Sequence, residues 1–381
     1  MLGNAWRVGR VAGIEIRIDS SWLVIAVLIG YSFYVRFDSL YAELGPAEGA
    51  LLAAVAALVF FSSVLGHELA HSITATSRGI PVKGITLFLL GGVTQARVES
   101  KSARDEFFIT IVGPLSSLFF GALLWGASTL AGPSDQAIPG VLGYLAWVNV
   151  GLAIFNLLPG FPLDGGRVLR SAIWGATGNF ERATRVAVTA GRTIGYLLAA
   201  LGLISIVSGQ FGGLWLVLLG WFIAQGAGAN LTQLQIERAL TGVHADDLMA
   251  RDLVEIPADL SVADAIDEYF MRYDHSAFPV TDQARTVGLL TLRQVRRVPS
   301  DDRAARRVTD CMSPVGDLDT VSPHTPMTAV LTRFEDQELN RVLVVDGPRV
   351  VGIITPNDVA RWIRRSEALR GQPTMRTANP K

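Results

Sequence analysis

Long stretches without a charged residue constrain this chain more than any other feature. Asp, Glu, Lys and Arg are absent from residues 20–35, 49–66, 107–134, 136–163 and 193–236. A helix that crosses the hydrocarbon core of a bilayer needs about 20 mostly apolar residues. The last stretch is long enough for two helices, and Ser208-Gly209-Gln210-Phe211-Gly212-Gly213 interrupts it. The sequence therefore predicts six spans, the second of which must continue through polar residues 67–77 to reach full length.

The density of charge divides the 381 residues into two parts. Residues 1–240 hold 15 Lys and Arg and 13 Asp and Glu, which is 28 of the 67 charged residues, whereas the other 39 lie in the final 141 residues. We expect the first part to be embedded in lipid and the second to be a soluble domain. The net charge of −1 gives no reason to expect a nucleic-acid partner. Cys311 is the only cysteine, so a disulfide framework and a thiolate zinc site are excluded.

Basic residues predict the orientation of the spans. They gather before span one, between spans two and three, and between spans four and five, whereas the alternate loops hold only Arg36 among basic residues. Positive loops stay on the cytoplasmic side, so we expect a multi-pass protein of the bacterial plasma membrane with both termini in the cytoplasm.

Two further segments have the pattern of strands. Residues 13–19 alternate apolar and polar side chains, and residues 84–96 are strand-like around Gly91-Gly92. Open strand edges are not tolerated in lipid, so these segments must pair with each other or with other protein. The expected fold class is a multi-pass α-helical membrane protein with small membrane-associated β elements and a cytoplasmic α/β domain.

The second span carries Gly66-His67-Glu68-Leu69-Ala70-His71. Residues four apart lie on one face of a helix, so His67 and His71 can offer two imidazole nitrogens to one metal ion, with Glu68 beside them to handle a proton. The alternative is that these are ordinary packed polar residues. Ionisable groups at membrane depth are costly and are functional by default, and no other histidine occurs in the first 240 residues. We therefore favour a metal site.

A catalytic zinc needs three protein ligands and an open position. No third histidine is present in the membrane part, and Asp164 is the only acid between Asp135 and Glu181. It lies in the segment 156–167, whose prolines and glycines end a helix. We expect span four to end there in a shaped loop that brings Asp164 to the histidines. A solvated aspartate in a cytoplasmic turn is the alternative.

These motifs together resemble the site-2 protease family of intramembrane zinc metalloproteases. The resemblance rests on His67-Glu68-Leu69-Ala70-His71 in one span and on Asn156-x-x-Pro159-x-x-Pro162-Leu163-Asp164-Gly165-Gly166 at the end of a later one. Gly113-Pro114-Leu115-Ser116-Ser117 resembles a further motif of that family, and the match covers about residues 1–230.

The resemblance implies a function for each of these residues. One zinc ion per chain would be held by His67, His71 and Asp164, and Glu68 would be the catalytic acid and base. Asn156 and Asn149 would hold the substrate backbone or the developing oxyanion. The substrates would be single-span membrane proteins, such as anti-sigma factors, and an extended substrate would add to the edge of the 84–96 hairpin.

The soluble part contains an internal repeat. Residues 287–295 match residues 351–359, and residues 278–282 match residues 342–346, both at an offset of 64. Each copy is expected to fold as strand, helix, strand, strand, helix. The pattern resembles a tandem pair of cystathionine-β-synthase-type (CBS) modules.

The expected domain boundaries follow from the two resemblances. A catalytic domain would cover residues 1–230, a linker 231–244, the CBS modules 245–300 and 301–365, and a disordered tail 366–381.

CBS pairs often bind adenosine nucleotides in the cleft between the copies, and they often dimerise. By resemblance Thr355 and Asp358 would contact the ribose, whereas Gln294 replaces the aspartate in the first copy. A helix-starting Asp358 that only caps its helix is the alternative.

Two other functions remain open at this point. A transporter or channel gated by the CBS modules would have an ion pathway and no catalytic metal. An inactive relative would bind helices without cutting them.

Overall fold

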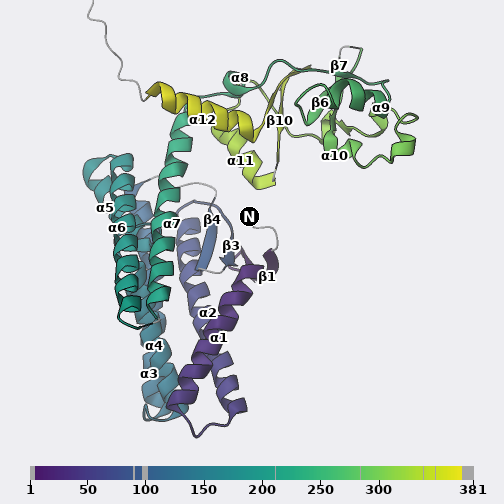
Figure 1. The fold of residues 1–381 in the computed structure, drawn as a ribbon. Helices are drawn as coiled ribbons and strands as arrows, with labels where there is room; N and C mark the ends of the chain where they lie inside the picture. Colours follow the sequence, from purple (N-terminus) through teal and green to yellow (C-terminus); the bar gives the residue numbers. More distant parts are fainter. Residues whose placement is uncertain are drawn as a thin grey trace, which may run out of the picture. The chain divides into compact units, whose positions relative to one another are not determined.

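The computed structural model describes residues 5–88, 91–96, 102–210, 212–283, 285–337, 339–347 and 349–370. The chain divides into two compact units, Met1–Thr232 and Gln233–Lys381. The model confirms the expected fold class, because the first unit is built mainly of apolar helices and the second of helices and small sheets (Figure 1).

Helices build most of the first unit in the described part of the chain, and the last of them continues past Thr232. They are α1 (Ser20–Leu40), α2 (Pro46–Ser77), α3 (Ala103–Ala131), α4 (Ala137–Asn156), α5 (Asp164–Thr177), α6 (Phe180–Val207) and α7 (Gly213–Leu240). Within the described residues α1, α2, α3, α4 and α6 are long and apolar enough to cross a membrane. The sixth predicted span corresponds to α7, whose apolar part, Gly213–Ala229, is shorter.

Helix α3 lies at the centre of this unit. It packs against α2, α4 and α5, and it lies beside α2 and α4 in Figure 1. Its small residues Gly113, Ser117 and Gly121 are fully covered by neighbouring helices. Small residues at helix contacts let backbones approach closely in membranes, where lipid removes the usual hydrophobic drive for association.

The segment after α4 differs from the expected loop. Helix α4 ends at Asn156, and residues 157–163 form the loop, but Asp164 is already the first residue of α5. Gly165 and Gly166 are therefore helical, although glycine disfavours a helix. Close packing explains them, because a Cβ on Gly166 would come within 2.7 Å of the Gly160 carbonyl oxygen.

A four-stranded sheet covers one side of α2. Its order is β1 (Ala5–Val11), β2 (Ile14–Asp19), β3 (Val82–Phe88) and β4 (Gly91–Ala96), with β2 and β3 parallel and the outer pairs antiparallel. The two segments predicted to be extended therefore pair with each other, as lipid requires. Ile85 and Leu87 pack with Leu65 and Leu69, which flank His67 on α2. The sheet thus supports the turn of α2 that carries the histidine motif.

The second unit contains the predicted repeat. The first copy runs β5 (Ile256–Pro257), α9 (Val262–Ala265), β6 (Ala277–Asp282), β7 (Arg285–Thr291) and α10 (Leu292–Val295). The second runs β9 (Thr320–Val321), α11 (Met327–Gln337), β10 (Val342–Asp346), β11 (Arg349–Ile354) and α12 (Pro356–Arg370). Both copies show the expected order of strand, helix, strand, strand, helix.

Each copy of the repeat completes the sheet of the other. Strand β8 (Ser313–Pro314) lies in the second module but pairs with β7 of the first. Ala250, after the short helix α8 (Ala245–Leu248) that begins the first copy, bridges to Ile353 of the second. The two copies therefore bury their cores jointly.

The end of the chain corrects one expectation. Residues 366–370 were expected in a disordered tail, but they continue α12 to Arg370. Trp362 and Ile363 pack on the second copy's core, and the residues after them have good helix propensity, so the helix extends. Residues 371–381 lie outside the described part of the chain.

We expect Gly195→Ala to destabilise the protein. Gly195 of α6 faces α7, and a Cβ there would lie 2.6 Å from the Gly220 carbonyl oxygen, which is backbone and cannot rotate away. Overpacking of this kind costs about 1–3 kcal/mol, and thermal unfolding in detergent measures it. Gly151→Ala is the matched control, since nothing lies within 4 Å of its Cβ position. An equal unfolding midpoint for the two variants would contradict the close helix contact.

Candidate metal centre

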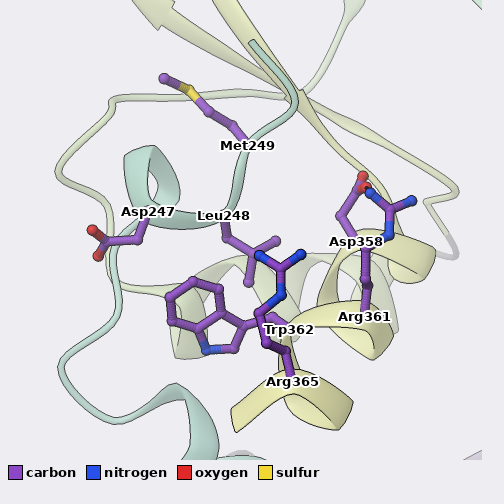
Figure 2. Close-up of a pocket in the computed structure, with 7 residues that line it drawn as sticks. All are labelled: Asp247, Leu248, Met249, Asp358, Arg361, Trp362 and Arg365. Carbon is purple, nitrogen blue, oxygen red and sulfur yellow. Dashed lines mark ion pairs between the residues drawn. The ribbon is translucent and has the colours of Figure 1, made fainter. Parts of the chain in front are cut away.

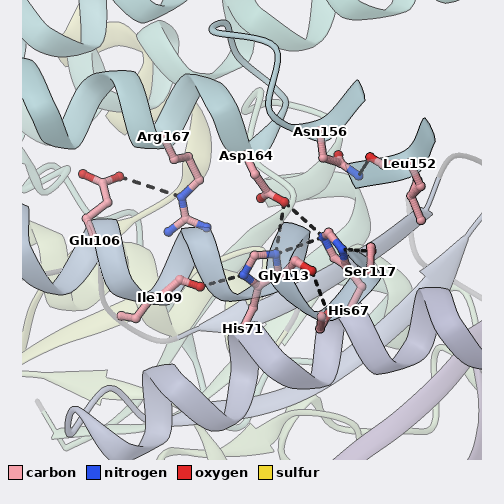
Figure 3. Close-up of polar contacts among 11 residues, drawn as sticks. His67, His71, Glu106, Ile109, Gly113, Ser117, Leu152, Asn156, Asp164 and Arg167 are labelled. Carbon is pink, nitrogen blue, oxygen red and sulfur yellow. Dashed lines mark hydrogen bonds and ion pairs between the residues drawn. The ribbon is translucent and has the colours of Figure 1, made fainter. Parts of the chain in front are cut away.

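Three side chains that are far apart in the sequence converge in the first unit. His67 and His71 lie on one face of α2 and are both buried. The Asp164 Oδ2 atom lies 3.0 Å from His67 Nε2 and 3.2 Å from His71 Nε2 (Figure 3). The two Nε2 atoms are 3.1 Å apart. The structure thus brings together the three residues that the sequence analysis names as metal ligands.

The spacing of these atoms fits a tetrahedral zinc ion. Zinc bonds to nitrogen and carboxylate oxygen of about 2.0–2.1 Å place neighbouring ligand atoms roughly 3.3 Å apart. The three observed distances between these atoms, 3.0, 3.1 and 3.2 Å, are close to that value. Two imidazoles and one carboxylate also form a known catalytic ligand set that leaves one coordination position open.

Helix α3 fixes the tautomer of the histidines. His71 Nδ1 lies 2.7 Å from the carbonyl oxygen of Ile109. A carbonyl can only accept, so Nδ1 carries a proton and donates it, and Nε2 is the nitrogen that the neutral ring can offer to a metal. His67 Nδ1 lies 2.9 Å from Ser117 Oγ, which can accept in the same way (Figure 3). Both rings are therefore oriented as metal ligands require.

A glycine on α3 keeps the space beside the ligand atoms open. A Cβ on Gly113 would overlap His71 Nε2 and would lie 2.7 Å from His67 Nε2. Any larger residue would therefore collide with the imidazole nitrogens that face the centre. Pro114, which follows it, lacks an amide hydrogen and interrupts the helix hydrogen bonding at this level. The absence of a side chain at Gly113, beside both Nε2 atoms, is the third feature that fits a metal ion.

Asp164 reaches the centre because α5 is held tightly against the preceding loop. Gly165 approaches Leu157 and Leu158 so closely that a Cβ would overlap their carbonyl oxygens. Phe161 of the loop is buried with Ala187 and Val188 of α6. The loop and the first turn of α5 therefore form one packed unit with the carboxylate at its start.

The proposed acid/base and the two asparagines lie around this centre in different ways. Glu68 is half-buried on α2, next to His67 and outside the cluster of three ligand atoms. Asn156 is half-buried and its amide donates to the Leu152 carbonyl (Figure 3). Asn149 is fully buried, and its amide donates to the Leu145 carbonyl. Its Oδ1 atom has no hydrogen-bond partner among the described residues. Both amides thus donate back to their own helix, and each would have to turn to reach a substrate.

The sequence analysis missed the residues of α3 and α5 that support the ligands. Glu106 is fully buried and forms an ion pair with buried Arg170 of α5. A signal for Glu106 was present, since it is an acid directly before the charge-free stretch 107–134. The contact of the Ile109 carbonyl with His71 could not be read from the sequence, because a backbone atom makes it.

A second candidate site lies in the C-terminal unit. Asp358 accepts hydrogen bonds from the Thr355 amide at 3.0 Å and from the Thr355 hydroxyl at 2.6 Å, so it caps α12. Beside it is a cavity of about 220 Å³ (Figure 2). The cavity is lined by Asp247, Leu248, Met249, Asp358, Arg361, Trp362 and Arg365. Two arginines and an indole ring thus share one cavity with Asp358, whereas Thr355 lies outside its lining.

At the equivalent position of the first copy, Gln294 is hydrogen-bonded to protein on two sides. The Gln294 side-chain oxygen accepts from the Thr291 amide and hydroxyl, at 2.7 and 2.8 Å. Its amide donates to Ser313 Oγ at 2.8 Å. Gln294 therefore repeats the cap that Asp358 makes and closes on Ser313.

Comparison with known proteins agrees with this arrangement. Residues 55–134 and 131–202 match the model of peptidase family M50, and residues 245–301 and 308–365 match that of the CBS domain. Rip3 of Mycobacterium tuberculosis is 38% identical over 383 residues, covering 98% of this chain and 97% of that protein. The protein sll0528 of Synechocystis is 32% identical, covering 96% and 97%. Both carry zinc metalloprotease in their names.

A solved structure, the site-2 protease from Methanocaldococcus jannaschii, is 28% identical and covers 60% of this chain and 95% of that chain, with a TM-score of 0.42. The likeness to Rip3 extends along nearly the whole length of both proteins. The two family resemblances found in the sequence are therefore confirmed. The chain belongs to peptidase family M50, the site-2 proteases, and is a membrane metalloprotease with a tandem pair of CBS domains.

Proposed function

We propose that this protein hydrolyses peptide bonds within the membrane-spanning segments of single-span membrane proteins. One observation carries the proposal. The side-chain atoms of His67, His71 and Asp164 lie at the distances expected of zinc ligands, and the two histidines are on α2, a helix apolar enough to cross a membrane. We assign the zinc ligands to these three residues. A transporter or channel would give no reason for three metal-binding atoms to meet there.

When bound, zinc supplies a Lewis acid that polarises the scissile carbonyl and acidifies a water molecule. The residues of the chain then carry the proton. The Glu68 carboxylate takes a proton from the attacking water and passes it to the leaving amine nitrogen. Its place one residue after His67 supports this role, since a shared turn of α2 keeps it near the centre.

Asn156 and Asn149 are the proposed donors to substrate. Asn156 is half-buried at the end of α4, beside the loop that leads to Asp164, so its amide can exchange the Leu152 carbonyl for a substrate carbonyl. Stabilisation of a developing oxyanion by a preorganised donor commonly accelerates acyl transfer by 10²–10³-fold. Asn149 is enclosed, and it reaches a substrate only if α3 and α4 separate.

The substrate must be extended for its peptide bond to reach the centre. Strand β4 ends the described sheet order, so one of its edges is available to a further strand. An unwound substrate segment would pair there by β-augmentation. The distribution of basic residues supports a cytoplasmic position for both termini, which would place the metal centre near the cytoplasmic side of the membrane. Anti-sigma factors are substrates of this kind.

The CBS pair is proposed to bind an adenine nucleotide in the cavity of Figure 2. Arg361 and Arg365 offer positive charge to phosphates, and the Trp362 indole offers a flat surface to a base. Asp358 Oδ1 lies 3.5 Å from Arg361 and is available to ribose hydroxyls. We propose that the pair also supports a homodimer.

Helix α7 offers a route by which the nucleotide would regulate proteolysis. In the first unit Ala227 and Leu231 pack with Phe161 of the metal-site loop. In the second unit Leu240 is buried in the core, and the Ala239 carbonyl accepts a hydrogen bond from Trp362 Nε1 at 3.3 Å. A ligand that contacts Trp362 therefore acts on the same helix that packs against the loop before Asp164.

Glu68→Gln and Asp164→Ala should separate proton transfer from metal binding. We expect Glu68→Gln to retain about one zinc per chain and to lose cleavage, because an amide cannot accept the proton. Asp164→Ala should lose both, since one of three ligands is removed. Metal analysis of the purified proteins and cleavage of a co-expressed single-span substrate test this. Persistent cleavage by Glu68→Gln would refute its role, and an unchanged metal content in Asp164→Ala would remove that residue from the ligand set.

Gly113→Ala should lower zinc affinity by more than tenfold, because the new methyl group would overlap His71 Nε2. Competition with a chelator measures the dissociation constant. Gly126→Ala on the same helix is the control, since nothing lies within 4 Å of its Cβ position. If both variants bind zinc as the wild type does, the metal does not lie beside Gly113.

Trp362→Ala and Arg365→Gln should each weaken ATP binding about tenfold or more, which corresponds to the loss of one good contact of about 1.4 kcal/mol. Calorimetric titration of the full-length protein in detergent tests this. Arg364→Gln is the control, because Arg364 is exposed on the same helix outside the cavity lining. Wild-type affinity in both cavity variants would exclude this cavity as the nucleotide site.

A further inference from the structure

A buried ion pair joins α3 to α5 beside the metal centre. Glu106 is fully buried, and Arg170 is 6% exposed. Arg170 Nε donates to Glu106 Oε1 at 2.8 Å, and its Nη2 atom contacts the same oxygen. Arg167 Nε lies 3.8 Å from that oxygen as well (Figure 3). None of these residues belongs to the metal ligand set or to the proposed acid/base chemistry.

The guanidinium of Arg170 is also held between two aromatic rings. Its central carbon lies 5.1 Å from the Phe161 ring centroid and 4.6 Å from that of Phe180. Contacts at this distance stabilise a cation, more so when it is desolvated. Phe161 is in the loop three residues before Asp164, and Phe180 begins α6. One side chain therefore ties α3, the metal-site loop, α5 and α6 together.

The position of Glu106 on α3 connects this tie to the histidines. Glu106 is one turn before Ile109, whose carbonyl orients His71. Gly113 and Ser117 follow on the same face of α3. Gly113 lies against both imidazoles, and Ser117 contacts His67 Nδ1. Helix α3 thus orients both histidines and also holds α5 through the Glu106–Arg170 pair. Asp164 is the first residue of α5. Movement of α5 along α3 would change the distances from Asp164 to the two imidazoles.

We propose that Glu106 and Arg170 are positioning residues that hold Asp164 in register with His67 and His71 and so set the affinity for the metal. This inference rests on the proposed function, because it takes those three residues as the zinc ligands. Residues that orient metal ligands commonly change metal affinity 10–100-fold when they are replaced. A pair that served packing alone would change stability and leave the affinity of the folded protein as it is.

Four variants of the full-length protein test the proposal. Glu106→Gln and Arg170→Gln each remove one charge of the buried pair, whereas the double variant removes both charges and leaves two amides that can hydrogen-bond. Arg170→Lys keeps the charge but loses the planar, two-nitrogen contact and the stacking on the rings. Arg185→Gln is the matched control, since Arg185 pairs with Glu181 at 2.7 Å on the exposed face of α6.

Two readouts separate positioning from folding. The zinc dissociation constant is measured by chelator competition on protein that elutes as a single species, and thermal unfolding is measured without metal. The visible absorption of the Co²⁺-loaded protein reports ligand geometry directly. We expect Arg170→Lys and both glutamine variants to bind zinc 10–100-fold more weakly and to shift the Co²⁺ spectrum. The double variant should bind more tightly than either single variant, and Arg185→Gln should match the wild type.

Wild-type zinc affinity and an unchanged Co²⁺ spectrum in Arg170→Lys would overturn the proposal, even if its unfolding midpoint fell. If the single variants fail to fold, the double variant decides: wild-type zinc affinity and an unchanged Co²⁺ spectrum in that variant would also overturn the proposal. Failure of the proposed function looks different, because the wild type itself would then bind no zinc or Asp164→Ala would bind it normally.

Discussion

The structure of the membrane unit depends on the close approach of three polar atoms beside Gly113: His67 Nε2, His71 Nε2 and Asp164 Oδ2. Two imidazole nitrogens and one carboxylate oxygen lie 3.0–3.2 Å from one another. Two imidazole nitrogens and a carboxylate oxygen at this distance are costly to bury unless a proton or a metal cation lies between them. The close approach of these three atoms therefore accounts for the buried hydrogen bonds of both imidazole Nδ1 atoms, for the glycine at position 113 and for the tight loop before Asp164.

Helix α3 is the element that makes this meeting possible. It contacts α2 through the Ile109 carbonyl and Ser117, and it contacts α5 through Glu106. Hydrogen bonds to the second nitrogen of a ligating histidine fix the tautomer and the ring orientation. The candidate metal ligands lie on α2 and α5, but their relative positions depend on α3, which supplies none of the three.

The CBS pair differs in its two copies. In the second copy Asp358 caps α12 beside a cavity with two arginines and a tryptophan, whereas in the first copy Gln294 makes the cap and also bonds Ser313. An amide that donates and accepts can satisfy itself against protein, but a carboxylate can only accept. This difference favours the second copy as the one that receives a ligand.

Much of this protein was determined by its sequence alone. The charge-free stretches, the spacing of His67 and His71, the single acid Asp164 and the repeat at an offset of 64 were enough to predict the membrane helices, the candidate ligands and the CBS pair. Each is a local pattern, because helix periodicity and hydropathy act over a few neighbouring residues. The helical state of Gly165 and Gly166 was not predicted, because tertiary packing outweighs the low helix propensity of glycine there. The continuation of α12 to Arg370 was not predicted either, although its last residues have good helix propensity.

Only the tertiary structure decided how the site is assembled. Three contacts show this: the Ile109 carbonyl on His71, the close approach of Gly113 to both histidines, and the Glu106–Arg170 pair. Each joins segments that are 38 to 64 residues apart in the sequence, and the first is made by a backbone atom. No residue type at one position reveals which distant helix will face it. The candidate metal ligands could therefore be named from the sequence, whereas their distances and orientation arise from the packing of α2 and α5 on α3.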